Sequence, residues 1–385
     1  MMLFLVTAEL PHRRQAAHKR IRAGSTYTAL GGSNTCDHPP QKVGFQTLVF
    51  EGLLARGQVT ERQNSCIHAM GPAYPSACLP YFVSRNTSYA TIEYVPNMGE
   101  QTALHLEHLR SLIVRLQRLR VVLAMVNIVP RDTSKRRFQE AHLGASALAR
   151  SRGIPLIVVD HRPKRELLWN TEERVVRHLN LEGHKWVAMR VLAAWEGARA
   201  RGQPAHRPLA ASTQTECIFG ASLRQVEPLG GSHRFALLQE PDHKGVLAYV
   251  ASEPNATLRL CLRRLPPSFL ATFAMESSDW RPMSNVTFAC EGEGCSCAPS
   301  TYVGRTSFRA TQNWLHRVTG HTNPPSSQVA SRDGCSCIVT LRNTRRAGDG
   351  MARVRLNGYV AGAASTGEWA NTYHLGFLRN RGHFV

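Results

Sequence analysis

The sequence predicts an α/β domain built on a parallel sheet, followed by an all-β domain. Its 385 residues are 43% hydrophobic and 19% charged, which is typical of a globular chain with at least two domains. Strand-like and helix-like segments alternate over the first half, whereas only short strand-like segments follow. We therefore predict a basic, irregular N-terminal stretch at 1–24, an α/β domain at 25–202 and a β-rich domain at 203–385.

In the first half, the spacing of hydrophobic residues indicates whether each element is a strand or a helix. The run "VVLAMVNIV" at 121–129 is unbroken and of strand length, as in a strand covered on both faces. By contrast, leucines and an isoleucine in 103–120 recur at the spacing of one helical face. The predicted strands are 27–32, 91–97, 121–129 and 154–160, and the predicted helices are 43–57, 103–120, 137–153 and 181–202. This alternation predicts a parallel sheet with helices on both faces.

The pattern changes near residue 203, where "RGQPAHRPLAAS" reads as a linker. Short strand-like segments separated by turn residues follow, without a helical pattern longer than three turns. These segments cover 234–240, 245–252, 257–265, 285–290, 335–341 and 351–362. We predict an antiparallel β-sandwich for this half.

The chain carries a formal net charge of +20. Such a field attracts nucleic acid, anionic lipid or acidic polysaccharide. The arginines are spread along the chain rather than clustered with aromatic residues, so solvated surface charge is favoured and specific nucleic-acid binding is not predicted. An anionic polysaccharide surface stays open as a partner.

Ten cysteines, six of them after residue 260, favour an oxidising compartment. Glycosylation sequons at Asn86, Asn255 and Asn285 agree with the secretory pathway or the extracellular space. The opening "MMLFLVTAEL" is too short to span a membrane and a poor signal peptide, so we expect the natural start to differ. No other segment predicts a transmembrane helix.

The stretch "GGSNT" places Ser33 directly after the first predicted strand. Ligands bind at the carboxyl edge of open parallel sheets, and small neighbours allow a close approach to the hydroxyl. Taken alone, the same residues also fit a plain turn with a helix-capping serine.

Four short segments, "GGSNT", "NSCIHAMGP", "IEYVPN" and "RHLNLEGH", occur in this order along the chain. Together they resemble the SGNH (GDSL-like) hydrolase family over roughly residues 26–200. The resemblance implies a flavodoxin-like three-layer α/β/α domain that needs no cofactor. It also implies Ser33 as the nucleophile, His178 as the base, and Gly71 and Asn97 as contributors to the oxyanion hole. His184, in the same segment, reads as a structural residue that packs against or caps the last helix.

The sequence departs from the family pattern near the histidine, where Val175 occupies the position of the usual aspartate. Glu172, Glu173 or Asp160 would have to orient the imidazole instead, or a backbone carbonyl would. Met98 and Asp37 are further departures. Three interpretations stay open: an esterase working with a Ser–His dyad, an inactive relative that still binds its ligand, and a surface-binding protein.

For an active enzyme, the resemblance implies hydrolysis of a carboxylic ester through an acyl-enzyme on Ser33. An acetylated or otherwise acylated polysaccharide is the preferred substrate. Lipid esters, and transfer of the acyl group to another sugar, are the alternatives.

The β-rich half contains a compact set of cysteines. Two Cys-x-Cys pairs point both thiols of each pair to one face of a strand. Zinc sites usually show wider spacing, so we favour disulfides over a four-thiolate zinc site, with their connectivity left open. The candidates are Cys290, Cys295, Cys297, Cys335 and Cys337. Some algal and protist SGNH-like proteins have a loosely similar tail, which implies an accessory module.

Overall fold

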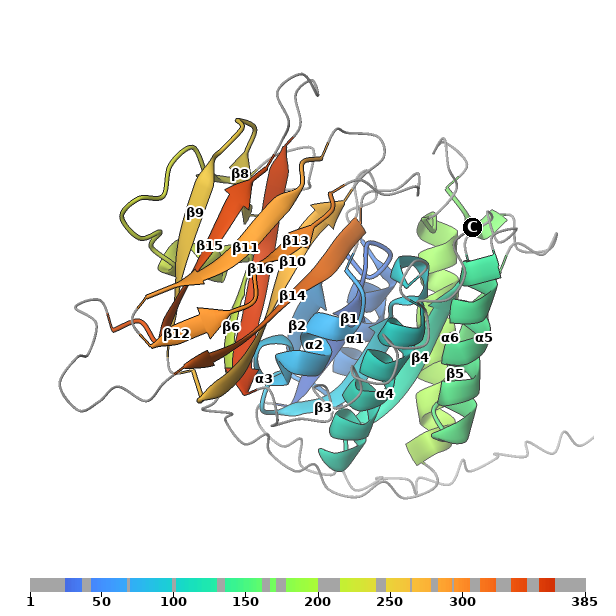
Figure 1. Cartoon of the computed structure of the whole chain (residues 1–385). Coiled ribbons are helices and arrows are strands. Elements are labelled where there is room, and N and C mark those ends of the chain that lie inside the picture. The colour runs from blue at the N-terminus through green and yellow to red at the C-terminus, as the bar shows by residue number, and fades with distance from the viewer. Residues whose placement is uncertain are drawn as a thin grey trace, which may run out of the picture.

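The computed structural model shows two domains side by side, one with a parallel sheet between helices and one made of antiparallel sheets (Figure 1). The predicted fold class is therefore confirmed. The structure describes residues 25–36, 43–67, 70–98, 102–129, 136–160, 167–170, 178–199, 215–239, 247–263, 265–277, 283–292, 294–304, 312–322, 334–344 and 353–363.

The first domain is built on a five-stranded parallel sheet in the order β2-β1-β3-β4-β5. This is the flavodoxin-like strand order, with its switch point between β1 and β3. The strands are β1 (Thr26–Gly31), β2 (Glu61–Cys66), β3 (Thr87–Glu93), β4 (Val122–Ile128) and β5 (Leu156–Val159). Strand β2, "ERQNSC", escaped sequence reasoning because it is a polar edge strand.

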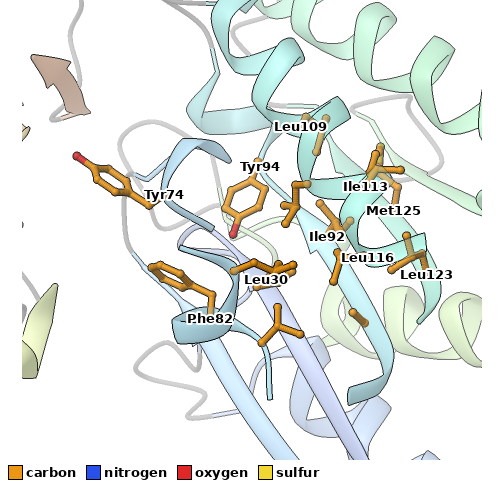
Figure 2. Packing of buried hydrophobic residues seen from close by; sticks show 14 of the residues in the cluster. Leu30, Tyr74, Phe82, Ile92, Tyr94, Leu109, Ile113, Leu116, Leu123 and Met125 are labelled. Carbon is orange, nitrogen blue, oxygen red and sulfur yellow. The ribbon is translucent and has the colours of Figure 1, made fainter. Parts of the chain in front are cut away.

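Helices cover both faces of this sheet. Helices α1 and α6 pack together on one face, and α4 and α5 cover the other. The helices are α1 (Phe45–Ala55), α2 (Ala73–Ala77), α3 (Leu79–Phe82), α4 (Thr102–Arg118), α5 (Arg136–Ser151) and α6 (Leu181–Arg199). Figure 2 shows Leu30 and Ile92 of the sheet packed with Leu109 and Leu116 of α4.

The second domain pairs a seven-stranded sheet with a four-stranded sheet over a shared hydrophobic core. The larger sheet has the order β12-β14-β10-β16-β8-β7, with β6 also on β16, and the smaller has the order β13-β11-β15-β9. The strands are β6 (Thr215–Phe219), β7 (Ala236–Gln239), β8 (Leu247–Ala251), β9 (Thr257–Leu262), β10 (Ser268–Ser277), β11 (Val286–Glu291), β12 (Cys295–Cys297), β13 (Ser300–Tyr302), β14 (Gln312–Thr322), β15 (Cys337–Asn343) and β16 (Val354–Ala363).

Disulfides connect the two sheets of the second domain. Both cysteines of β12, a strand of the larger sheet, bond to strands of the smaller sheet, as two thiols on one strand face allow. The five disulfides are Cys36–Cys66, Cys78–Cys217, Cys261–Cys335, Cys290–Cys297 and Cys295–Cys337.

In the described part of the chain, no helix combines the length and the apolar character that a membrane crossing requires.

Candidate active site

Ser33 lies in a tight turn directly after β1, at the carboxyl edge of the sheet. The turn closes through a hydrogen bond from Thr35 N to Gly32 O of 3.1 Å. Gly31 is needed there, because a Cβ at this position would collide with the Thr35 side chain and the backbone of Glu93. The Ser33 side chain is partly exposed, whereas its neighbours in the turn are buried.

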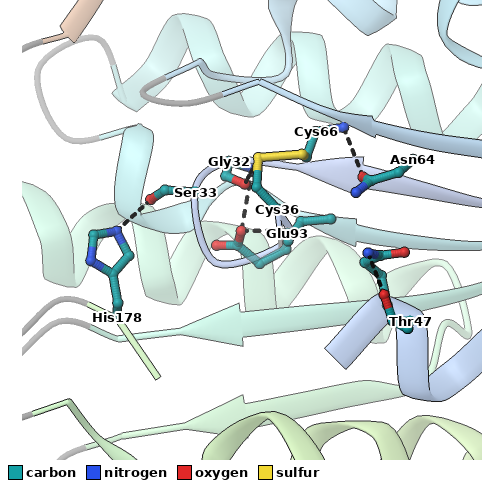
Figure 3. The surroundings of a disulfide bond; sticks show 10 residues. Gly32, Ser33, Cys36, Thr47, Asn64, Cys66, Glu93 and His178 are labelled. Atoms are coloured by element: carbon teal, nitrogen blue, oxygen red, sulfur yellow. Dashed lines mark hydrogen bonds between the residues drawn. A yellow bond between two sulfur atoms is a disulfide. The ribbon is translucent and has the colours of Figure 1, made fainter. Parts of the chain in front are cut away.

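His178 is brought to Ser33 from 145 residues away. The distance between its Nε2 and Ser33 Oγ is 2.7 Å, the length of a good hydrogen bond (Figure 3). Backbone contacts fix the histidine: Asn170 N donates to His178 O over 2.9 Å, and the next residue, Leu179, donates its N–H to Asn34 Oδ1 over 3.1 Å. The same turn that presents the serine therefore also holds the segment of the histidine.

Asn97 lies against the serine turn. It ends a short 3-10 helix, η1 (Val95–Asn97), that follows β3. Its side-chain amide nitrogen occupies the space where a Cβ of residue 32 would lie, so only glycine fits beside it. The structure thus brings the Asn97 amide next to the residue that precedes Ser33.

Gly71 reaches the same edge of the sheet by way of β2. Cys66, the last residue of that strand, is in register with Gly31, and Ile67 N donates to Gly31 O over 3.0 Å. The chain therefore leaves β2 at the level of the serine turn. Gly71 then packs against the His105 ring of α4, where a Cβ would collide.

A disulfide ties the serine turn to the segment that leads to Gly71. Cys36 and Cys66 have Cα atoms 5.4 Å apart, and Cys36 is the last described residue of the turn (Figure 3). The residue that directly follows "GGSNT" is therefore covalently bonded to a residue of "NSCIHAMGP".

Glu93, at the end of β3, is a site residue that sequence reasoning missed. Its Oε2 accepts hydrogen bonds from Thr35 Oγ1 (3.2 Å) and Gly32 N (3.3 Å), and its side chain is 1% exposed. Burial raises the pKa of Glu93 to about 8, although these two hydrogen bonds lower it. The one available signal was an acidic residue that closes the strand "TSYATIE", whose other residues are all uncharged.

The residues considered as orienters of the imidazole fall largely outside the described part of the chain. Glu172, Glu173 and Val175 lie there, as does Asp37. Asp160 is described, and its charge acts on His142 of α5, raising that pKa against the larger, lowering effect of burial. Its backbone oxygen accepts from Trp169 Nε1 over 3.4 Å.

His184 is structural, with one correction to the expected contact. Its ring is buried in α6, and its Nδ1 accepts the backbone N–H of Phe45 over 3.1 Å. It therefore caps the first helix, not the last. The N-cap residue Gly44 offers α1 no side-chain acceptor, so the histidine satisfies a donor that would otherwise be orphaned.

The cysteine cluster of the second domain does not fit zinc. The sulfurs of Cys290, Cys295 and Cys337 lie within 4.8 Å of one another, close enough to share an ion. Each is bonded in a disulfide, however, and zinc takes thiolates.

No protein-family model matches the sequence, and no curated protein does. Solved structures match well. A crystal structure of a two-domain esterase (CEX) active on acetylated mannans matches with a TM-score of 0.57 and 14% identity, over 89% of this chain and 93% of that one. The chain has the fold of a two-domain esterase.

The same esterase co-crystallised with mannopentaose matches this chain with a TM-score of 0.56 and 16% identity, over the same shares of the two chains. Both matches span the α/β and the β-rich domains, so the two-domain esterase fold applies to the whole architecture. At this level of identity the likeness establishes the fold and leaves the chemistry to the site residues.

Proposed function

We propose that this protein is a carboxylic ester hydrolase of the SGNH type that uses Ser33 as its nucleophile. The observation that carries the proposal is the 2.7 Å contact between Ser33 Oγ and His178 Nε2 at the carboxyl edge of the sheet. A serine hydroxyl becomes a competent nucleophile when a neighbouring imidazole takes its proton. The fold supplies the second support, since it is shared with an esterase.

In the proposed reaction, Ser33 Oγ attacks the ester carbonyl carbon while His178 Nε2 takes the hydroxyl proton. The carbonyl oxygen becomes an oxyanion, which the N–H groups of Ser33 and Gly71 and the Asn97 amide stabilise. The imidazolium then protonates the leaving alcohol, which leaves an acyl group on Ser33. Water, deprotonated by His178, releases the acid and restores the serine.

The position of the Asn97 amide nitrogen against Gly32, the residue before Ser33, supports its role as one of these donors. Removing one donor of an oxyanion hole costs on the order of 10²–10³ in kcat. The backbone contacts of the histidine segment also support this scheme, because Asn170 holds the backbone of His178 and Asn34 holds the adjacent Leu179.

The proposed substrate is an acyl group, acetyl above all, on a polysaccharide. The shared two-domain fold supports it, since that esterase is active on acetylated mannans. We further propose that the protein works in the secretory pathway or outside the cell. The five disulfides fit an oxidising compartment, where such bonds persist.

Labelling with a fluorophosphonate probe tests the nucleophile. The parent protein is expected to label, and Ser33→Ala and His178→Ala are expected not to. Ser151→Ala is a matched control, because this exposed serine ends α5 at the opposite edge of the sheet and is expected to label like the parent. A well-folded parent that does not label would contradict the proposal.

Product analysis tests the substrate. Acetate release from acetylated mannan and xylan is compared with hydrolysis of long-chain lipid esters, using Ser33→Ala as the blank. Free acetate indicates hydrolysis, whereas a new ester on an added sugar indicates acyl transfer. Polysaccharide binding that survives Ser33→Ala, in a parent that turns over no ester, would identify a binding protein instead.

A further inference from the structure

The segment that starts at Gly71 is anchored in the β-rich domain. Helix α2 follows Gly71 and Pro72, and Cys78 is its C-cap residue. Cys78 forms a disulfide with Cys217 of β6, 139 residues along the chain. A covalent bond between the two domains therefore lies one short helix away from the proposed oxyanion glycine.

Aromatic packing reinforces this bond. The rings of Tyr74 on α2 and Phe219 on β6 meet edge to face, with centroids 4.3 Å apart, and both side chains are buried. Tyr81 on α3 donates its hydroxyl hydrogen to Phe219 O over 2.9 Å. In Figure 2, Tyr74 lies at the rim of the first domain's core, away from Leu116 and Leu123.

The second domain fixes Phe219 in turn. Phe219 is in register with Gly358 of β16, and a Cβ at Gly358 would collide with the Phe219 ring. The glycine thus opens the space that this ring needs. Also on β6, Glu216 Oε1 accepts the hydroxyl hydrogen of Tyr359 over 3.0 Å. The position of Phe219 is therefore fixed by β16, a strand in the middle of its sheet.

Helix α4 contacts the segment of Gly71 and α2 on the side opposite β6. The ring of His105 packs on Gly71, and the guanidinium of Arg115 donates to the backbone oxygen of Ser76 in α2. Gly71 and α2 are therefore clamped between α4 and β6.

We propose that Phe219 and Cys217 of the β-rich domain are positioning residues that hold the Gly71 N–H at the oxyanion. This inference rests on the proposed function. An oxyanion donor works only within hydrogen-bond distance of the developing charge, and small misplacements are costly. The second domain then contributes to the rate of the chemical step on any ester, including one too small to touch that domain.

The first test compares Phe219→Leu with Phe288→Leu, using p-nitrophenyl acetate as the small ester. Phe288 is a buried phenylalanine in the core of the same domain, on β11, so it controls for the loss of a ring. We expect Phe219→Leu to lower kcat about tenfold or more with KM changed by less than about twofold, as misplacement of a transition-state contact predicts. Phe288→Leu is expected to lower the melting temperature and to keep kcat.

The second test removes the bond between the domains without creating a large cavity. Cys78→Ala/Cys217→Ala is compared with Cys290→Ala/Cys297→Ala, which removes a disulfide inside the second domain. Only the first pair is expected to lower kcat, measured at a temperature at which both variants are folded.

If both the Phe219 and the Cys78/Cys217 variants keep the kcat of the parent, the inference is wrong. The proposed esterase function is unaffected by that result. If Phe219→Leu does not fold, the disulfide pair decides alone. A parent that neither hydrolyses esters nor labels with the fluorophosphonate contradicts the proposed function itself.

Discussion

Thr35, a residue of the serine turn, donates its hydroxyl hydrogen to Glu93, with 3.2 Å between Thr35 Oγ1 and Glu93 Oε2. The Gly32 N–H reaches the same carboxylate oxygen over 3.3 Å. A fully buried carboxyl group thus holds two residues of the turn that presents Ser33. Because burial raises the pKa of Glu93 to about 8, this group is neutral at pH 7.

Stability is therefore expected to depend on the protonation of Glu93. Between the unfolded pKa of 4.5 and the folded value of about 8, the folded state binds more protons than the unfolded state. The free energy of unfolding then falls as pH rises through this window and stays low above it. In Glu93→Gln, which stays neutral and keeps an acceptor, this fall is expected to disappear. Urea unfolding at about pH 6 and about pH 9 measures it.

Glu140→Gln is the matched control, because Glu140 is an exposed residue of α5. It is expected to keep the pH dependence of the parent. An equal fall with pH in Glu93→Gln and the parent would show that another group titrates.

Gly71→Ala is expected to lower kcat by about 10- to 100-fold, because the new Cβ would collide with the His105 ring and push the backbone N–H away. Replacing that ring removes the obstacle. In a His105→Ala background, Gly71→Ala is therefore expected to cost much less. A double-mutant cycle on kcat measures the coupling, and additive losses would show that the collision is not the cause.

Loss of the Cys36–Cys66 disulfide is expected to affect both stability and the site. The bond closes a loop with a sequence separation of 30, and the loop-entropy model gives about 3–4 kcal/mol for its removal. Cys261→Ala/Cys335→Ala opens a loop of separation 74 in the other domain and is expected to cost at least as much stability. Only Cys36→Ala/Cys66→Ala should slow fluorophosphonate labelling; equal labelling rates would show that the turn holds without its disulfide.

His184→Ala is expected to lower the free energy of unfolding and to leave kcat unchanged. The backbone N–H of Phe45 would lose its acceptor in a buried site, which costs about 1–3 kcal/mol. His233→Ala changes an exposed histidine of the second domain and serves as the comparison. Chemical denaturation gives the stability and p-nitrophenyl acetate gives kcat. A large fall in kcat would place His184 in the reaction rather than in the core.

Local patterns were sufficient to predict the α/β fold. The helical spacing within 103–120 corresponds to α4, and the unbroken apolar run at 121–129 corresponds to β4. Both patterns were informative because each shows which side chains of its segment are buried. The fold also brings Ser33 Oγ and His178 Nε2 to within 2.7 Å of each other, and these are the two residues that the resemblance to SGNH hydrolases singles out. Strand order and motif order are linked here, because parallel strands end at one edge of the sheet.

Other features depend on tertiary contacts and leave little local signal. Strand β10 is buried on both faces, so its segment "SFLATFAMES" lacks the alternation that marks a half-buried strand. The pairing of Cys78 with Cys217 depends on how the domains pack. The role of Glu93 appears only once the serine turn folds over it.

The place of β16 has a consequence for biosynthesis. It is the last described strand in chain order, yet it lies between β10 and β8 and also pairs with β6. During synthesis the larger sheet therefore cannot close until the ribosome has released Val354–Ala363, whereas the sheet of the first domain is complete far earlier. Strand β6, which carries Cys217, reaches its place in the sheet only with β16, so the order of synthesis leaves Cys78 open to pairing with a nearer cysteine before its native partner is in position.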